Sequence, residues 1–201
     1  MMKKMKNSRR GEIGYKIARL FLKPIFLLYY RPRFFNKDVI PKKGPIILAG
    51  NHIHILDQCL PLVCTKRAVH YLAKKEYFDS KFAWFFKFVG CISVNRKIKD
   101  TNAINQALDI LNKGGAIGIF PEGTRNKTNS LLLPFKLGTV SMAQKTGALI
   151  VPFGITGEYK RGKDNNLTLR FGEPFKVGKE ESLQEANNKL RKIIEKLIKE
   201  N

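Results

Sequence analysis

A histidine and an aspartate lie five residues apart just after a short apolar run. The run covers residues 46–49 and is typical of a buried strand; His52 and Asp57 follow its end. In a regular helix residues i and i+5 point about 140° apart, so these side chains meet only if the chain turns between them. Asp57 would then lie early in a following helix. In that arrangement the carboxylate fixes the tautomer of the imidazole, and the other ring nitrogen can take a proton from a hydroxyl. The pair is a candidate general base, although isolated His–Asp pairs are also common in structural roles.

Further polar groups follow two other predicted strands. The apolar run 116–120 leads through Pro121 into Glu122, Gly123, Thr124 and Arg125, and Arg96 follows the run 91–94. The planar guanidinium of an arginine binds two phosphate oxygens at once, and a glycine lets the backbone approach a ligand. These residues therefore predict an anion site. The alternative is an ordinary turn with a surface ion pair between Glu122 and Arg125.

Strands that alternate with helices predict an α/β fold whose core is a largely parallel sheet flanked by helices. The expected strands cover residues 46–50, 68–73, 91–94, 116–120, 148–153 and 167–171. The expected helices cover residues 58–65, 75–89, 101–113, 135–145 and 183–199. Ligands of such sheets bind beyond the carboxyl ends of the strands, which is where the polar groups lie. We divide the chain into an N-terminal segment, residues 1–40, and an α/β domain, residues 41–201.

The N-terminal segment is strongly basic and contains an amphipathic pattern. The whole chain has 38 Lys and Arg against 16 Asp and Glu, a net charge of +22; residues 1–43 hold 13 basic and 2 acidic residues, which is +11. Residues 12–31 predict a helix that Pro24 should kink or break. A cationic amphipathic helix suits the surface of an anionic bilayer. The alternatives are a helix packed on its own domain with a solvated basic face, or a basic protein that binds nucleic acid.

Other sequence signals are weak. The longest uncharged run, residues 44–56, is too short and too polar to span a membrane, and the basic start lacks the apolar core of a signal peptide. The spacing of Cys59, Cys64 and Cys91 does not predict a metal site.

Four ordered blocks of this sequence resemble the glycerolipid acyltransferase family, specifically its bacterial 1-acyl-glycerol-3-phosphate acyltransferases. His52 and Asp57 match the His-x4-Asp motif, and residues 90–96 resemble the block Gly-x-Ile-x-Val-x-Arg. Residues 120–126, FPEGTRN, match the third block, and residues 150–153 resemble the fourth, an apolar stretch around Pro152. The segment after the third block also fits, at Phe135, Lys136 and Gly138. One departure is His54, which could compete for Asp57; the motif spacing assigns the base to His52.

The resemblance implies an enzyme that transfers an acyl group to lysophosphatidate and so makes phosphatidate for phospholipid synthesis. His52, oriented by Asp57, would deprotonate the free hydroxyl of the lysolipid, which then attacks an acyl thioester of acyl carrier protein or coenzyme A. No metal or other cofactor is implied. Pro152 would shape the acyl-donor side, and Lys74, with Lys75 as a competitor, would contact phosphate. The glycerol phosphate would be held by Arg96, Glu122, Gly123, Thr124 and Arg125.

The expected partners are anionic membrane lipids, lysophosphatidate and the thioester donor, with no nucleic acid. We expect a peripheral, monotopic protein on the cytoplasmic face of the membrane, held there by the N-terminal helix. The motifs leave open another acceptor, such as glycerol 3-phosphate or a different lysolipid, and a membrane-binding relative without catalysis.

Overall fold

A mostly parallel sheet forms the centre of the computed structural model, which describes residues 2–98, 100–162 and 166–200, with side chains from Gly11 onward. In these residues seven strands pair in the order β1-β7-β6-β2-β5-β3-β4, and only β6 and β7 run antiparallel. The strands are β1 (Arg33–Phe35), β2 (Ile46–Gly50), β3 (Val69–Lys74), β4 (Ile92–Val94), β5 (Ala116–Ile119), β6 (Leu149–Thr156) and β7 (Thr168–Phe171). The predicted fold class is confirmed.

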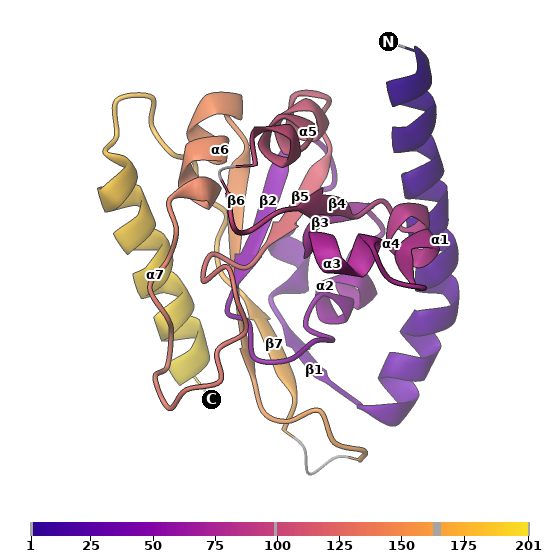
Figure 1. The fold of residues 1–201 in the computed structure, drawn as a ribbon. Helices are drawn as coiled ribbons and strands as arrows, with labels where there is room; N and C mark the ends of the chain where they lie inside the picture. Colours follow the sequence, from indigo (N-terminus) through magenta and orange to yellow (C-terminus); the bar gives the residue numbers. More distant parts are fainter. Residues whose placement is uncertain (1, 99, 163–165, 201) are drawn as a thin grey trace.

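Helices cover both faces of this sheet, and Figure 1 shows α1 on one side and α7 on the other. Ile46 and Leu48 of β2 pack towards α1 and α2, whereas Ile47 and Ala49 pack towards α5, α6 and α7. Successive side chains of a strand point to opposite faces, so a strand buried on both faces has to be apolar throughout, as β2 is. The helices are α1 (Met2–Tyr29), the 3-10 helix η1 (Lys37–Val39), α2 (Cys59–Cys64), α3 (Lys75–Phe78), α4 (Ala83–Phe88), α5 (Thr101–Asn112), α6 (Gly138–Thr146) and α7 (Leu183–Lys199).

The register of the central strands fixes where the functional loops emerge. Ala49 of β2 pairs with Ile119 of β5 on one side and with Pro152 of β6 on the other. The loops after β2 and β5 therefore leave the same edge of the sheet, side by side.

The N-terminal segment differs from the expectation at Pro24 and in the chain that follows α1. Helix α1 runs unbroken from Met2 to Tyr29 with Pro24 inside it, so the predicted break at Pro24 is wrong. A proline in a helix interior costs about 3 kcal/mol, and the burial of Phe26, only 4% exposed, offsets part of that cost. The chain after α1 also joins the sheet, because β1 pairs with β7. Residues 33–35 of the N-terminal segment thus pair with a strand of the α/β domain, and the division at residue 40 stays a prediction.

The segment 75–89, which the sequence predicts as one helix, forms the two short helices α3 and α4. The side chain of Ser80 donates to the carbonyl of Tyr77 and accepts from the amide of Phe82, so it ends α3 and begins the turn into α4.

Small residues bring α1 close to the domain. A Cβ atom on Gly14 would lie 1.8 Å from the carbonyl oxygen of Phe88, and one on Gly11 would lie 2.8 Å from Cα of Gly90. Arg19 donates to the carbonyls of Leu62 and Val63 at the end of α2.

The opposite side of α1 is apolar and exposed. Its exposed large apolar residues are Ile13, Ile17, Leu20, Phe21, Ile25, Leu27, Leu28 and Tyr29. Nearby α4 adds Trp84 and Phe88, with Phe82 just before it. Among the residues described, no helix combines the length and apolar character needed to cross a membrane.

Candidate active site

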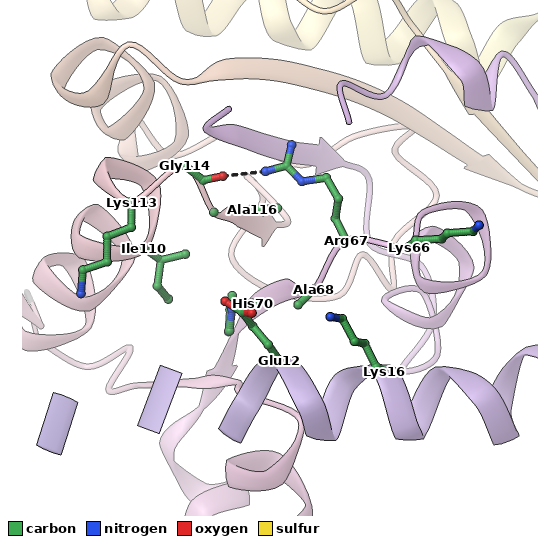
Figure 2. A pocket seen from close by; sticks show the side chains of 11 residues that line it. Glu12, Lys16, Lys66, Arg67, Ala68, His70, Ile110, Lys113, Gly114 and Ala116 are labelled. Atoms are coloured by element: carbon green, nitrogen blue, oxygen red, sulfur yellow. Dashed lines mark hydrogen bonds between the residues drawn. The ribbon is translucent and has the colours of Figure 1, made fainter. Parts of the chain in front are cut away.

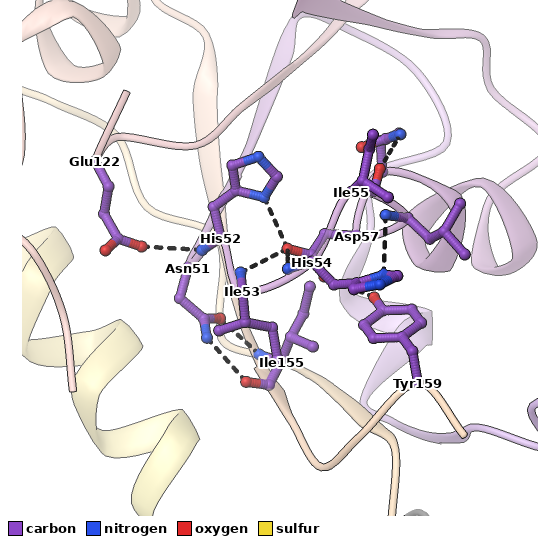
Figure 3. Close-up of polar contacts among 11 residues, drawn as sticks. Asn51, His52, Ile53, His54, Ile55, Asp57, Glu122, Ile155 and Tyr159 are labelled. Carbon is purple, nitrogen blue, oxygen red and sulfur yellow. Dashed lines mark hydrogen bonds and ion pairs between the residues drawn. The ribbon is translucent and has the colours of Figure 1, made fainter. Parts of the chain in front are cut away.

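His52 and Asp57 meet, as the sequence predicts, in the loop after β2. His52 Nδ1 lies 2.8 Å from Asp57 Oδ2, and the Asp57 carboxyl group is fully buried (Figure 3). A carboxylate accepts only, so Nδ1 carries the proton of this hydrogen bond and Nε2 keeps a lone pair. The ring of His52 stacks on Phe120 with 4.1 Å between ring centroids and 9° between planes. This geometry allows His52 to accept a proton through Nε2.

The turn between the two residues is built around the Asp57 carboxylate. Its Oδ2 atom also accepts the amides of Ile53 (2.7 Å) and His54 (2.8 Å). The Asp57 amide donates back to the His54 carbonyl at 3.2 Å. Asp57 lies two residues before α2 rather than inside it. Within the described residues, these hydrogen bonds satisfy the buried carboxylate of Asp57 without a cationic partner at Oδ2 other than the His52 ring.

The strand that precedes the dyad is held by Asn51. The Asn51 side chain donates to the carbonyl of Ile155 (2.8 Å) and accepts its amide (2.7 Å), which locks the end of β2 to β6. Asn126 donates its amide to the His52 carbonyl at 2.7 Å. His52 therefore sits on backbone that is fixed from two sides.

His54 is placed away from the chemistry of the dyad. Its ring stacks on Tyr159, with centroids 4.2 Å apart, and its Nδ1 accepts the amide of Leu56 at 3.3 Å. Within the part of the chain that the structure describes, His54 contacts Asp57 through its backbone amide and carbonyl and not through its ring. The structure therefore gives the general-base geometry to His52.

The contact between Tyr159 and Asp57 could not be predicted from the sequence. The Tyr159 hydroxyl donates to Asp57 Oδ1 at 2.7 Å from the loop between β6 and β7, 102 residues along the chain. Burial, and then the nearby charge of Asp57, raises the pKa of Tyr159 far above its usual value, so the hydroxyl stays protonated and donates. No motif or spacing links such distant residues, so the sequence carries no signal for this contact.

Glu122 holds the backbone of the site. Its Oε1 accepts the amide of His52 (2.9 Å) and its Oε2 accepts the amide of Leu133 (2.8 Å), and the residue is 4% exposed. Burial raises the pKa of this carboxyl group, and the two amide donors oppose that rise. The resemblance implied that Glu122 contacts the glycerol phosphate. In the structure each oxygen accepts a backbone amide, so Glu122 holds the backbone of the site, and its contact with phosphate stays a prediction. Among the described residues it forms no ion pair with Arg125.

A cavity of about 240 Å³ opens beside His52. Arg96 and Lys136 contribute cationic side chains to its lining, and Gly123 contributes backbone. Asp100 also lines it, but its oxygens accept the amides of Asn95 and Ala103 at the start of α5. Apolar lining comes from Leu72, Val94, Ile98, Ile104 and Ile119. A cavity lined by both cationic and apolar side chains suits an amphiphilic anion.

Gly123 and Lys136 are linked by close packing. Gly123 has φ of 70°, a left-handed conformation that favours glycine, and a Cβ atom there would lie 2.9 Å from Lys136 Cε. Lys136 was noted in the sequence only as part of a family-like segment, and the structure brings it to the cavity with Arg96.

The other predicted site residues do not line this cavity. Thr124 and Arg125 lie in the loop beyond it, with Arg125 half-buried. Lys74 ends β3, and its ammonium pairs with Glu76 at 3.0 Å. Pro152 is buried within β6, opposite Ala49. Their predicted roles with phosphate and donor remain predictions.

A comparison with family models matches residues 31–156 to the family described as Acyltransferase. The chain belongs to the acyltransferase family. The resemblance drawn from the four sequence blocks is thereby confirmed, and the dyad, the Arg96 loop and Glu122 all lie inside the matched range.

Relatives of this acyltransferase carry one recurrent name. A 1-acyl-sn-glycerol-3-phosphate acyltransferase of Bacillus subtilis is 31% identical over an alignment of 169 residues, and the match covers 80% of this chain and 82% of the relative. A protein of the same name from Borreliella burgdorferi is 38% identical over an alignment of 120 residues, and the match covers 58% of this chain and 48% of the relative. The chain thus spans most of the first relative and about half of the second.

A solved structure shares the fold of the acyltransferase. The 1-acyl-sn-glycerophosphate acyltransferase PlsC from Thermotoga maritima aligns with a TM-score of 0.75 over 92% of this chain and 78% of its own. The two sequences are 23% identical, so this likeness concerns the fold.

Proposed function

We propose that this acyltransferase moves a fatty acyl group from a thioester donor to the free hydroxyl of 1-acyl-glycerol 3-phosphate, giving phosphatidate. The observation that carries the proposal is the buried His52–Asp57 dyad beside a cavity with Arg96 and Lys136 in its lining. The names of the relatives support the same acceptor.

The dyad can carry both proton transfers of such a reaction. His52 Nε2 takes the proton of the acceptor hydroxyl as its oxygen attacks the thioester carbonyl carbon. The tetrahedral intermediate then collapses, the C–S bond breaks, and the departing sulfur takes the proton back from the imidazolium. Asp57 holds the ring and stabilises its charged form without becoming protonated itself. The nucleophile belongs to the substrate, so the chain needs no serine of its own.

The cavity beside His52 would bind the acceptor lipid. Arg96 and Lys136 reach it from the end of β4 and from the segment before α6, and they would hold the phosphate. The apolar lining would contact the acyl chain. The donor is acyl carrier protein or coenzyme A thioester, and thioester chemistry of this kind draws on no metal or redox cofactor.

The exposed side of α1 would place the enzyme on a bilayer. Leu20, Phe21 and Leu28 are 71%, 64% and 75% exposed, and Trp84 beside α1 is 66% exposed. Exposed apolar patches of this kind mark interaction surfaces, and Trp favours the bilayer interface. The net charge of +11 in residues 1–43 would add attraction to anionic lipids. We infer peripheral attachment at the cytoplasmic face of the membrane.

The test of the acceptor uses the full chain with mixed micelles. Lysophosphatidate, glycerol 3-phosphate and lysophosphatidylcholine are each offered with labelled acyl carrier protein or coenzyme A thioester, and the lipids are analysed. The proposal expects phosphatidate as the main product. Efficient acylation of glycerol 3-phosphate or of the choline lipid, with little phosphatidate, would favour a different acceptor.

A further inference from the structure

A second cavity lies at the other edge of the sheet. It has a volume of about 260 Å³ and opens beside Ala68, just before β3, and Ala116, the first residue of β5. The dyad follows the opposite, carboxyl ends of the strands. Figure 2 shows side chains from α1, from the turn before β3 and from the end of α5 around this cavity. It is therefore separate from the candidate active site.

The lining of this cavity is strongly cationic. Lys16, Lys66, Arg67 and Lys113 contribute four positive charges, against one negative charge from Glu12, which leaves +3. These cations come from three different segments and meet only through the tertiary fold. Gathering like charges costs free energy unless an anion compensates them.

Arg67 anchors the floor of the cavity. Its guanidinium donates to the carbonyls of Pro41 (2.9 Å), Gly44 (2.6 Å) and Gly114 (2.8 Å). Partial burial lowers its pKa, but an arginine still stays charged. These three carbonyls hold the charge of Arg67 in place, and no carboxylate among the described residues pairs with it.

The three lysines have uncommitted ammonium groups. Across residues 2–98, 100–162 and 166–200 no ion pair or side-chain hydrogen bond engages Lys16, Lys66 or Lys113, and all three are exposed. Lys113 follows the carboxyl end of α5, where a cation also complements the helix dipole. That role accounts for one lysine and leaves the other two without a structural reason to converge.

We propose that this cavity binds the phosphate of an anionic lipid headgroup. Lysine ammonium groups on flexible stems suit a phosphate as point charges. Basic pockets between membrane-spanning helices bind lipid headgroups, and a basic pocket beside a helix on the bilayer surface offers the same attraction. The choice of a lipid rests on the proposed placement of α1 on a bilayer. Lys16 neighbours the exposed apolar residues Ile13, Ile17 and Leu20 on α1. If these residues enter the bilayer, the ammonium of Lys16 would lie close to the lipid headgroups. The cavity itself does not depend on acyl transfer.

The experiment follows the backbone amides of Gly114, Gly115 and Ala116 by NMR in the full chain, held in phosphatidylcholine bicelles. Phosphatidylglycerol is titrated in one arm and inorganic phosphate in the other. The variant Lys16→Gln/Lys66→Gln/Lys113→Gln is compared with Lys145→Gln/Lys179→Gln/Lys192→Gln. The second set removes the same charge from exposed lysines outside both cavities.

Phosphatidylglycerol should shift these amides saturably in the wild type and in the control variant. The cavity variant should bind at least about tenfold more weakly, since each ammonium near an anionic surface contributes about a fivefold factor. Equal weakening in both variants, or no saturable shift, would overturn the proposal. Saturation by phosphate at the same concentration as by lipid would overturn the lipid assignment and show an anion site for a soluble phosphate. Acyl transfer measured on the same variants reports separately on the proposed function.

Discussion

The substitution Tyr159→Phe tests how the buried carboxylate of the dyad is held. It removes only the hydroxyl that donates to Asp57 Oδ1 and keeps the ring that stacks on His54. Asp57 is fully buried, so water cannot replace the lost donor. A hydrogen bond to a charged group is worth about 1.5–3 kcal/mol. The free energy of unfolding should therefore fall by about 2 kcal/mol.

The same change should slow catalysis without weakening acceptor binding. Three donors remain on Oδ2, so the dyad survives but the carboxylate is held at one oxygen only. We expect kcat to fall about tenfold, which corresponds to about 1.4 kcal/mol of transition-state stabilisation. The KM for lysophosphatidate should stay within about twofold, because Tyr159 does not line the substrate cavity.

The assay measures initial rates over a range of lysophosphatidate concentrations, with thermal unfolding in parallel. Tyr71→Phe is the matched control, since the hydroxyl of Tyr71 is buried and has no partner among the described residues. It should leave kcat unchanged and stability equal or higher. If Tyr159→Phe keeps the wild-type kcat, or raises only KM, Tyr159 does not hold the dyad and the reasoning is refuted.

Three further predictions concern Glu122, Lys136 and α1. Burial raises the pKa of Glu122 in the folded state. The stability that the protonated Glu122 contributes is therefore present below the ordinary pKa of 4.5 and is lost as the pH rises through the folded-state pKa. When unfolding is measured between pH 4 and 8, the wild type should lose stability relative to Glu122→Gln as the pH rises. A constant difference would contradict this. Lys136→Ala should raise the KM for lysophosphatidate about tenfold with a smaller change in kcat, and an unchanged KM would remove Lys136 from the phosphate site. In sedimentation, Leu20→Glu/Phe21→Glu should release the folded protein from vesicles of phosphatidylglycerol and phosphatidylcholine. The control Gln106→Glu/Asn188→Glu adds the same charge on α5 and α7 and should stay bound. Equal binding of the two variants would refute the role of α1.

The sequence predicted well those features that depend on local pattern. Apolar runs such as that of β2, alternating with helical segments, were enough for the α/β fold. The spacing of His52 and Asp57 was enough to predict the turn that joins them. Both rest on short stretches of chain whose physical requirements are visible in residue order.

Other features depend on packing that residue order does not show. The apolar stripe of α1 would ordinarily face the core, yet Gly11 and Gly14 let the helix backbone approach the domain instead and leave Leu20 outside. Glu122 follows its strand like a ligand-binding residue, but tertiary contacts turn it to two backbone amides. Local propensity at Pro24 predicts a kink or a break, but α1 continues through it, and the burial of Phe26 offsets part of the cost.

The central claim is that His52 removes the proton from the acceptor hydroxyl. Single-turnover acyl transfer to lysophosphatidate, followed with His52→Gln and with His54→Gln, tests it most directly. Loss of a positioned general base typically costs 10²–10⁴-fold in rate, so His52→Gln should lose at least about 100-fold. His54→Gln should stay within about fivefold, since only the backbone of His54 reaches Asp57. A His52→Gln enzyme that transfers acyl groups at the wild-type rate, or a larger loss in His54→Gln, would contradict the account.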